Sequence, residues 1–254
     1  MPSAAWSSAS SPASASPGGF PRGSRVLDAG CGDGQVAIFL ASKGLRLTGI
    51  DVMVRHLQNS WRNIRKAGLP AGQVEVLYAD YHHLEHIPDA LYDGVYTMET
   101  LLHATDPAAA LAGFFRVLRP GGRLVLHESE HPEDTGDRQG RDKVEKTAAI
   151  NELAAMPTNQ VTASGFYRKL LEDTGFVDIE EEDLSENIRP LARLIYAIEI
   201  VPYYIIRLFR LDRYFVNVIA GVRGFTGESP WSYVVIDATK PGGTSEDGSE
   251  KKEE

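Results

Sequence analysis

A carboxylate and three closely spaced glycines stand near the start of the chain. Asp28 is followed by Gly30, Gly32 and Gly34 in the stretch VLDAGCGDG, which continues a short apolar run. Glycine permits positive φ and carries no Cβ atom, so the backbone of such a turn can approach a ligand closely. The helix expected next would add free N–H groups, which favour polar or anionic atoms. The stretch therefore predicts a ligand-binding turn between a strand and a helix.

Two further carboxylates, Asp51 in TGID and Asp80 in YAD, end the next two strand-like runs. Ligands of parallel sheets bind beyond the carboxyl ends of the strands, and an acid at the end of the second strand commonly accepts hydrogen bonds from ribose hydroxyls. The dinucleotide pattern G-x-G-x-x-G is absent because Gln35 replaces its third glycine. Asp28 would also repel a pyrophosphate. These residues predict a nucleoside ligand that carries a positive charge and no phosphate.

The elements that must position these side chains alternate along the chain. Strands are expected at residues 24–30, 45–51, 73–80, 92–99, 123–129, 176–182 and 232–240. Helices are expected at residues 34–44, 54–68, 108–122 and 163–175, the third opened by the Asp106-Pro107 pair. Repeated β-α-β units favour an α/β fold. We predict a Rossmann-like, seven-stranded, mostly parallel sheet with helices on both faces and a helical insertion before the last strand.

Composition limits the class of protein and its partners. The 254 residues suit one large domain, and the net charge of -9 disfavours nucleic acid as a partner. A single cysteine excludes an internal disulfide, and we expect a cytoplasmic protein. Residues 1–23 form a Ser/Ala/Pro-rich tail without the features of a secretion signal, and residues 241–254 form an acidic tail. The predicted domain spans residues 24–240.

At these motifs the chain resembles the class I S-adenosylmethionine-dependent methyltransferases. VLDAGCGDG is similar to the first motif of that family, TGID to the second and YAD to the third. YDGVYTMETLLHATDP and RVLRPGGRLVLHE resemble its fourth strand, the following loop and its fifth strand, so the likeness covers residues 25–128. Within the family, METLLHATDP is most similar to the small-molecule and sterol C-methyltransferase branch. The resemblance implies S-adenosylmethionine as cofactor.

The same resemblance implies a role for each motif residue. Gly30, Gly32 and Gly34 would line the methionine part of the cofactor, with Asp28 near its ammonium group. Asp51 would bind the ribose hydroxyls. The remaining residues lie around adenine or toward the methionine end: Val52 and Met53 against the ring, Asp80 at its amino group with Tyr81 beside it, and Met98 and Glu99 near the methionine end or the substrate. Simple capping of a strand end stays open for Asp51 and Asp80.

Candidate catalytic residues follow from the chemistry of methyl transfer. The departing thioether is neutral, so positioning and desolvation can supply much of the catalysis. A base is needed only where the acceptor loses a proton. We propose His103, Glu99 and Glu128 for this role, with His103 first, although a packing role for His103 is equally open. His82, His83 and His86 do not have the spacing of a zinc motif, and no metal site is expected.

Residues 189–227 are rich in Ile, Leu, Tyr and Phe and lie before the last strand. Their uncharged runs are far shorter than the roughly 20 residues of a spanning helix. Two interpretations stay open besides plain core packing: a helical lid over an apolar substrate, which we favour, and an amphipathic surface for a membrane or a partner. The residues expected to face the substrate are Tyr203, Tyr204, Phe209 and Phe215.

We predict an S-adenosylmethionine-dependent methyltransferase acting on an apolar small molecule such as a lipid, terpenoid or polyketide. One alternative is a cyclase or isomerase on the same fold that keeps the cofactor as a cationic prop without methyl transfer. The other is a non-catalytic partner subunit. Intact Asp28, Gly30, Gly32 and Asp51 favour cofactor binding but do not separate the two enzymes. Members of the family usually carry helices before the first strand, whereas a low-complexity tail stands there in this chain. A more open pocket, a pocket completed by a second subunit in a homodimer and a pocket covered by residues 189–227 all stay open. Peripheral membrane contact stays open for residues 189–227.

Overall fold

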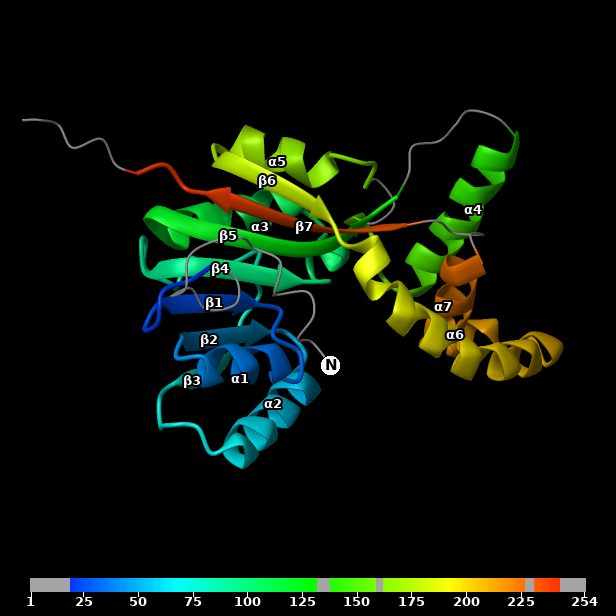
Figure 1. Ribbon diagram of the computed structural model, residues 1–254, viewed down its shortest axis with the longest axis horizontal. Helices are drawn as coiled ribbons and strands as arrows, with labels where there is room; N and C mark the ends of the chain where they lie inside the picture. The colour runs from blue at the N-terminus through cyan, green and yellow to red at the C-terminus, as the bar shows by residue number, and fades with distance from the viewer. Residues whose placement is uncertain (1–18, 132–137, 159–161, 227–230, 243–254) are drawn as a thin grey trace, which may run out of the picture.

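A seven-stranded sheet forms the centre of the molecule, which a computed structural model describes for residues 19–131, 138–158, 162–226 and 231–242. The strands lie in the order β3-β2-β1-β4-β5-β7-β6 (Figure 1). They are β1 (Arg25–Ala29), β2 (Arg46–Asp51), β3 (Val74–Tyr78), β4 (Tyr92–Met98), β5 (Leu118–Glu130), β6 (Val177–Asp183) and β7 (Ser232–Thr239). Strand pairs β3-β2, β2-β1, β1-β4 and β4-β5 are parallel, and β7 runs antiparallel between β5 and β6. The predicted mostly parallel sheet is confirmed.

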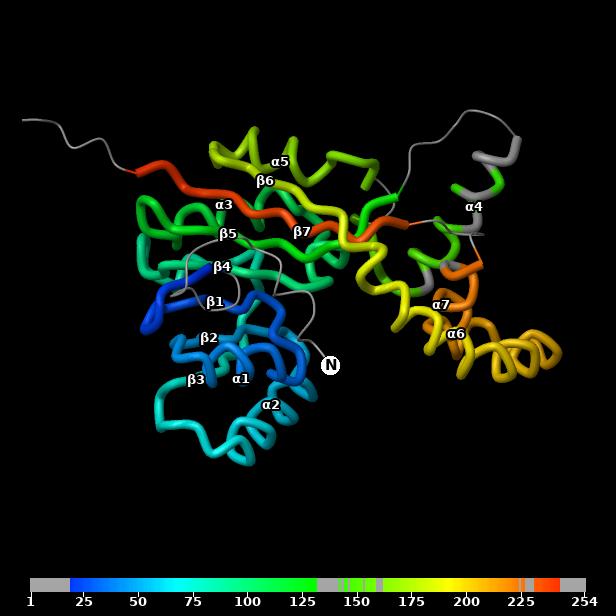
Figure 2. Tube along the Cα trace, viewed as in Figure 1, coloured from blue at the N-terminus to red at the C-terminus, as the bar shows by residue number. Residues whose placement is uncertain are grey.

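Helices cover both faces of this sheet, and a further group of helices lies beyond the ends of its strands. They are α1 (Gln35–Ser42), α2 (Val54–Ala67), α3 (Pro107–Val117), α4 (Arg138–Leu153), α5 (Phe166–Thr174), α6 (Ser185–Leu208) and α7 (Val216–Thr226), with 3-10 turns η1 (Leu101–His103) and η3 (Asp212–Tyr214). Figure 2 follows α1 and α2 on one face and α3 and α5 on the other. One core joins Phe114 and Leu171 to Leu126 of the sheet, and the other joins Leu40 to Val26. Both faces are therefore closed by apolar packing.

The boundary between α3 and β5 differs from the predicted one. The Asp106 carboxylate accepts a hydrogen bond of 2.9 Å from the Ala109 N–H, so the helix begins where the sequence indicates. It ends at Val117, whereas the prediction continued it to Gly122. Leu118 already pairs with Tyr92 of β4, so the fifth strand starts five residues before the predicted Arg123. The pairing of Leu118 with β4 sets this boundary. A local sequence pattern could not predict it, because the partner strand lies elsewhere in the chain.

The fold also reaches further toward the N-terminus than the predicted domain start at Ser24. Phe20 is 1% exposed and packs in the same core as Val26 and Leu40. A Cβ added to Gly94 would lie 2.6 Å from the Cζ atom of Phe20, so the ring fills the space that this glycine leaves. Phe20 thus belongs to the domain and corrects the predicted tail, residues 1–23, of which 1–18 lie outside the described residues.

The predicted helical insertion before the last strand is present as α6, η3 and α7. α6 begins at Ser185, four residues before the predicted start, and contains both Pro190 and Pro202. Figure 1 shows α4, α6 and α7 gathered beyond the carboxyl ends of β4 and β6. α4 was not predicted. Within the described part of the chain, no helix is both long and apolar enough to cross a membrane.

Candidate functional site

The glycine turn after β1 lies where strand order reverses between β1 and β4. Gly30, Gly32 and Gly34 all have positive φ, at 90°, 51° and 75°. A Cβ added to Gly30 would lie 2.6 Å from the Oγ1 atom of Thr100, and one added to Gly34 would collide with Ser60. No heavy atom lies within 4 Å of the Cβ position of Gly32, so this part of the turn is open. The turn therefore offers bare backbone to a ligand at the predicted place.

Asp28 lies beneath this turn and is almost fully enclosed. It is 3% exposed, and its Oδ2 atom has no hydrogen-bond partner. Burial raises the pKa of the Asp28 carboxyl to about 7, a hydrogen bond from Tyr96 opposes the rise, and Asp51 adds to it. An unpartnered buried carboxylate oxygen fits a cationic ligand group, which would compensate its lost hydration.

Asp51 ends β2 and also holds the glycine turn. Its Oδ2 atom accepts a hydrogen bond of 3.0 Å from the Gly32 N–H, and its Oδ1 atom accepts one of 2.7 Å from the Met53 N–H. The Oδ2 atom also lies 3.2 Å from the Nδ1 atom of His56, so Oδ1 is the oxygen that keeps further acceptor capacity, which suits a ribose hydroxyl. Val52 and Met53 follow with 46% and 53% of their surface exposed. Two bare apolar side chains beside a carboxylate are the surroundings that an adenosine group needs.

Asp80 after β3 is more engaged with its own neighbours than Asp51. Its Oδ1 atom accepts a hydrogen bond of 2.9 Å from the His82 N–H and lies 2.7 Å from the Nδ1 atom of the same residue. Burial alone would raise the pKa of the Asp80 carboxyl. The hydrogen bonds from His82 outweigh burial, so the pKa is lowered on balance. Tyr81 beside it donates a hydrogen bond of 3.3 Å from its hydroxyl to the Thr100 carbonyl. The capping role left open for Asp80 is thus present, and its second oxygen is left for a ligand.

Glu99 and His103 come together just after β4. Glu99 has φ of 51°, and its N–H donates a hydrogen bond of 2.7 Å to the His127 carbonyl. Burial raises the pKa of the Glu99 carboxyl, and nearby His103 lowers it in part. The His103 Nδ1 atom lies 2.9 Å from the Ala155 carbonyl oxygen, so Nδ1 donates this hydrogen bond and Nε2 is the ring nitrogen that remains for a substrate. Met98, the last residue of β4, precedes this pair.

Glu128, the third predicted catalytic residue, lies under the turn and away from solvent. It is 0% exposed. Its Oε1 atom accepts hydrogen bonds of 2.8 Å from the Thr97 hydroxyl, 3.2 Å from the Thr100 N–H and 3.0 Å from the Leu101 N–H. Burial raises the pKa of the Glu128 carboxyl to about 7, against these bonds. The three donors are one side-chain hydroxyl and two backbone N–H groups of the segment that follows β4.

Three residues of this site escaped the sequence analysis: Tyr96, Thr97 and Thr100. Tyr96 contributes the hydrogen bond to Asp28, and the two threonines contribute those to Glu128. In the sequence all three belong to an ordinary strand and its loop. The available signal was their position inside the recognised stretch YDGVYTMETLLHATDP.

The aromatic residues predicted to face the substrate lie on the helical insertion, and most are exposed. Tyr204 and Phe209 are 66% and 65% exposed, and Phe215 is 47% exposed. Tyr203 is partly buried, and its ring packs edge-on against Tyr204 with centroids 5.5 Å apart. The insertion is therefore helical as predicted, and the described residues do not enclose these rings.

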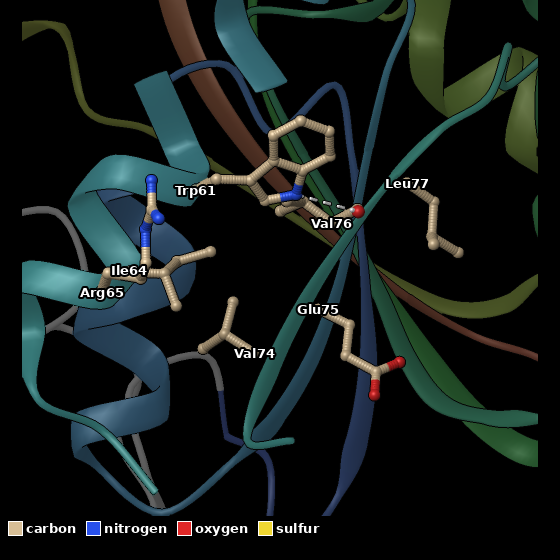
Figure 3. A pocket seen from close by; sticks show the side chains of 7 residues that line it. All are labelled: Trp61, Ile64, Arg65, Val74, Glu75, Val76 and Leu77. Carbon is tan, nitrogen blue, oxygen red and sulfur yellow. Dashed lines mark hydrogen bonds between the residues drawn. The ribbon is translucent and has the colours of Figure 1, made fainter. Parts of the chain in front are cut away.

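A cavity of about 530 Å³ lies elsewhere, between α2 and the edge strand β3. Trp61, Ile64 and Val76 are among its lining residues, and the Trp61 indole N–H donates a hydrogen bond of 3.4 Å to the Val76 carbonyl (Figure 3). None of the predicted cofactor or substrate residues lines it. Among the described residues, no group of three or more His, Cys, Asp or Glu could hold a metal ion.

Comparison with known proteins adds sequence evidence to this geometry. Residues 27–126 match the family described as a methyltransferase domain. The chain is 44% identical over 223 residues to an S-adenosyl-L-methionine-dependent Diels-Alderase of Talaromyces variabilis, covering 87% of this chain and 76% of that protein. It is 44% identical over 162 residues to an S-adenosyl-L-methionine-dependent Diels-Alderase of a Neonectria species, covering 63% of this chain and 62% of that protein.

Methyl-transferring relatives are more distant, and one solved structure is a cyclase. The chain is 34% identical over 167 residues to an O-methyltransferase of Aspergillus nomiae, covering 65% of this chain and 70% of that protein. The crystal structure of the 4+2 cyclase SpnF is similar with a TM-score of 0.66 and 25% identity, covering 87% of this chain and 77% of that one.

Proposed function

Because the chain belongs to the class I S-adenosylmethionine-dependent methyltransferase family, its cofactor follows from its fold, and we propose that its reaction is a cyclisation. The proposed enzyme catalyses a 4+2 cycloaddition within an apolar polyene and keeps S-adenosylmethionine without transferring its methyl group. This is the alternative that the sequence analysis placed second to methyl transfer. The 44% identity with a Diels-Alderase over 87% of the chain carries the proposal.

The site's chemistry supports a reaction without net proton transfer. A 4+2 cycloaddition forms two carbon–carbon σ bonds while three π bonds become one, and no proton or leaving group departs. Glu128 is 0% exposed and its Oε1 atom already accepts hydrogen bonds from Thr97, Thr100 and Leu101, so this carboxyl is not presented to a substrate as a base. The site can instead act by holding diene and dienophile together in the reactive geometry.

The cofactor site has the residues that such a catalyst needs. When bound, S-adenosylmethionine supplies a fixed positive charge beside the substrate, which can polarise a conjugated carbonyl group. Asp28 offers an unpartnered carboxylate oxygen to the ammonium group, and Asp51 offers an acceptor to the ribose. The open backbone at Gly32 leaves room for the methionine part. We propose that His103 orients a polar group of the substrate through its Nε2 atom.

The helical insertion is proposed to hold the apolar part of the substrate. Large apolar side chains on α6 recur at exposed positions 191, 194, 198, 201, 205 and 208, which form one stripe of the helix. A folded polyene would cover part of this stripe and so remove apolar surface from water. We propose Tyr203, Tyr204, Phe209 and Phe215 as contacts at its far end.

The test is to supply a linear polyene with a linked diene and dienophile and to analyse the product by mass spectrometry. We expect an isomer of unchanged mass, formed faster than without enzyme, while the amount of S-adenosylmethionine stays constant. S-adenosylhomocysteine, which is neutral at sulfur, should support a slower reaction. A product heavier by one methylene, with stoichiometric S-adenosylhomocysteine, would contradict the proposal.

That contrary result would instead support the second candidate, O-methyl transfer, which the more distant relatives favour. In that reaction His103 would accept the proton of the acceptor hydroxyl at Nε2. His103→Ala would then abolish turnover, whereas for the cyclisation it should reduce the rate only partly.

A further inference from the structure

Glu128 and Thr100 connect the ends of four strands that surround the cofactor site. Glu128 lies near the end of β5, and Thr100 follows β4. The Thr100 N–H donates to Glu128, and the Thr100 carbonyl accepts from the Tyr81 hydroxyl after β3 at 3.3 Å. The Thr100 side chain packs on Gly30 after β1, where it fills the space of the missing Cβ. A shift of Thr100 would therefore be felt at the glycine turn.

The hydrogen bonds at Glu128 fix the conformation of residues 97–101. Three donors from this turn converge on the single Oε1 atom, namely the Thr97 hydroxyl and the N–H groups of Thr100 and Leu101. Glu99 lies inside the turn with φ of 51°, a conformation that costs energy for a residue other than glycine. Such a conformation persists only where neighbouring contacts hold it. The three hydrogen bonds to the Glu128 carboxylate are contacts of this kind.

We propose that Glu128 is a positioning residue that fixes the 97–101 turn and, through Thr100, holds the Gly30 turn in the shape that binds the cofactor. It acts without touching the cofactor or the substrate. The same contacts keep Glu99 at the edge of the reaction site. The inference is independent of whether the enzyme cyclises its substrate or methylates it.

Glu130 provides a matched control on the same strand. It is 1% exposed, and its carboxylate also accepts hydrogen bonds from backbone N–H groups, of Gly165 at 3.0 Å and Tyr167 at 3.4 Å. These donors belong to the start of α5, away from the glycine turn. Glu130→Gln therefore removes the same kind of buried carboxylate without altering the contact with Thr100.

The experiment compares Glu128→Gln, Glu130→Gln and the unaltered full chain. Calorimetry measures the Kd of S-adenosylmethionine, and hydrogen exchange is followed on the cofactor-free protein. Glu128→Gln should raise the Kd about tenfold, since it weakens charge-assisted hydrogen bonds. It should also speed exchange of the Thr100, Leu101 and Gly30 amides. Glu130→Gln should leave the Kd and these amides unchanged while speeding exchange at Gly165 and Tyr167.

An unchanged Kd in Glu128→Gln, or an equal rise of the Kd in both variants, would overturn the proposal, since the second result indicates a general loss of packing. Thr97→Val serves if Glu128→Gln does not fold. It removes one donor to Oε1 and keeps the shape of the side chain. A Kd raised about two- to threefold with faster exchange at Thr100 supports the proposal, and unaltered values of both reject it.

Discussion

Asp28 illustrates a conflict between stability and binding within one side chain. Its carboxyl is enclosed, lacks a partner at Oδ2, and has a pKa raised by burial to about 7 from the usual 3.8. Without a ligand the buried charge therefore destabilises the folded protein at neutral pH. With a ligand ammonium group beside it, the same charge contributes to affinity.

Asp28→Asn should make the cofactor-free protein more stable at pH 8 and weaken its affinity for S-adenosylmethionine. The folded-state pKa lies above the unfolded value, so the contribution of Asp28 to stability is complete below about pH 4 and is lost as the pH rises to about 7. The gain of the variant at pH 8 is on the order of a few kcal/mol. Thermal melts between pH 5 and pH 8 measure this gain. The melting temperature of the variant should still fall somewhat as the pH rises, because burial also raises the pKa of Glu128. A melting temperature that changes equally with pH in the variant and in the unaltered chain would show that burial does not raise the pKa of Asp28.

At the residue scale, motif residues could be predicted and their supporting contacts could not. Asp28 and Asp51 stand at the ends of apolar runs, and the consequence of that placement in a parallel sheet is general. The contact between Thr100 and Gly30 depends instead on how the turn after β4 folds back over the turn after β1. Seventy residues separate the two in sequence, and no local pattern records their distance.

α6 is the element whose surface is least explained by the packing of the described residues. Ile206 is buried on the helix, whereas the stripe from Leu191 to Leu208 is exposed. Ile219 and Val222 of α7 are buried as well, so the contact between α6 and α7 uses a different side of the helix. An exposed stripe of this kind marks a surface that functions by contact.

Replacing Tyr204 and Phe209 together by serine should raise the KM for an apolar substrate and leave the Kd of S-adenosylmethionine nearly unchanged. The reason is that these rings lie on the insertion, whereas the cofactor residues lie on the turns after β1 and β2. Steady-state kinetics and calorimetry give the two constants. Val177→Ser, at the opposite end of β6, is the control for loss of exposed apolar surface. Lost binding to liposomes with unaltered turnover would show that the insertion serves a membrane instead.

At the element scale, strand and helix types were predicted better than their ends and additions. The Asp106 cap placed the start of α3, while the start of β5 depended on pairing between Leu118 and Tyr92. α6 passes through two prolines that a local interpretation would take as breaks. The prediction of a helical insertion succeeded there because its apolar content was considered as a whole.

Over the whole molecule, the predicted cofactor residues lie at the ends of adjacent strands of the sheet. β3, β2, β1 and β4 are neighbours in this order, and Asp80, Asp51, Gly30 and Glu99 lie at or just after their carboxyl ends. Sheet order was predictable in type from the repeated β-α-β units. The position of β7 between β5 and β6 was not, since antiparallel pairing leaves no mark in a short apolar strand.

S-adenosylmethionine should raise the melting temperature of the chain, and NAD should not. A ligand at about a hundred times its Kd adds about 2.7 kcal/mol to the free energy of unfolding, which corresponds to roughly 5–10 °C for a domain of this size. We expect no shift with NAD because Gln35 replaces a glycine of the dinucleotide pattern and Asp28 disfavours phosphate. Differential scanning fluorimetry measures both shifts. An equal shift with NAD would contradict the cofactor assignment.

The helical insertion leaves the sheet and returns to it at neighbouring points. Asp183 of β6 is paired with Val234 of β7, and the Leu184 N–H donates a hydrogen bond of 2.8 Å to the Tyr233 carbonyl. α6, η3 and α7 are therefore a very long hairpin loop, and the entropy of closing a loop grows only slowly with its length. Insertions, deletions or replacements in this loop therefore need not change the register of the strands whose ends carry the predicted cofactor residues. Under the proposed function, exchanging this one segment would change substrate choice and leave the predicted cofactor residues in place.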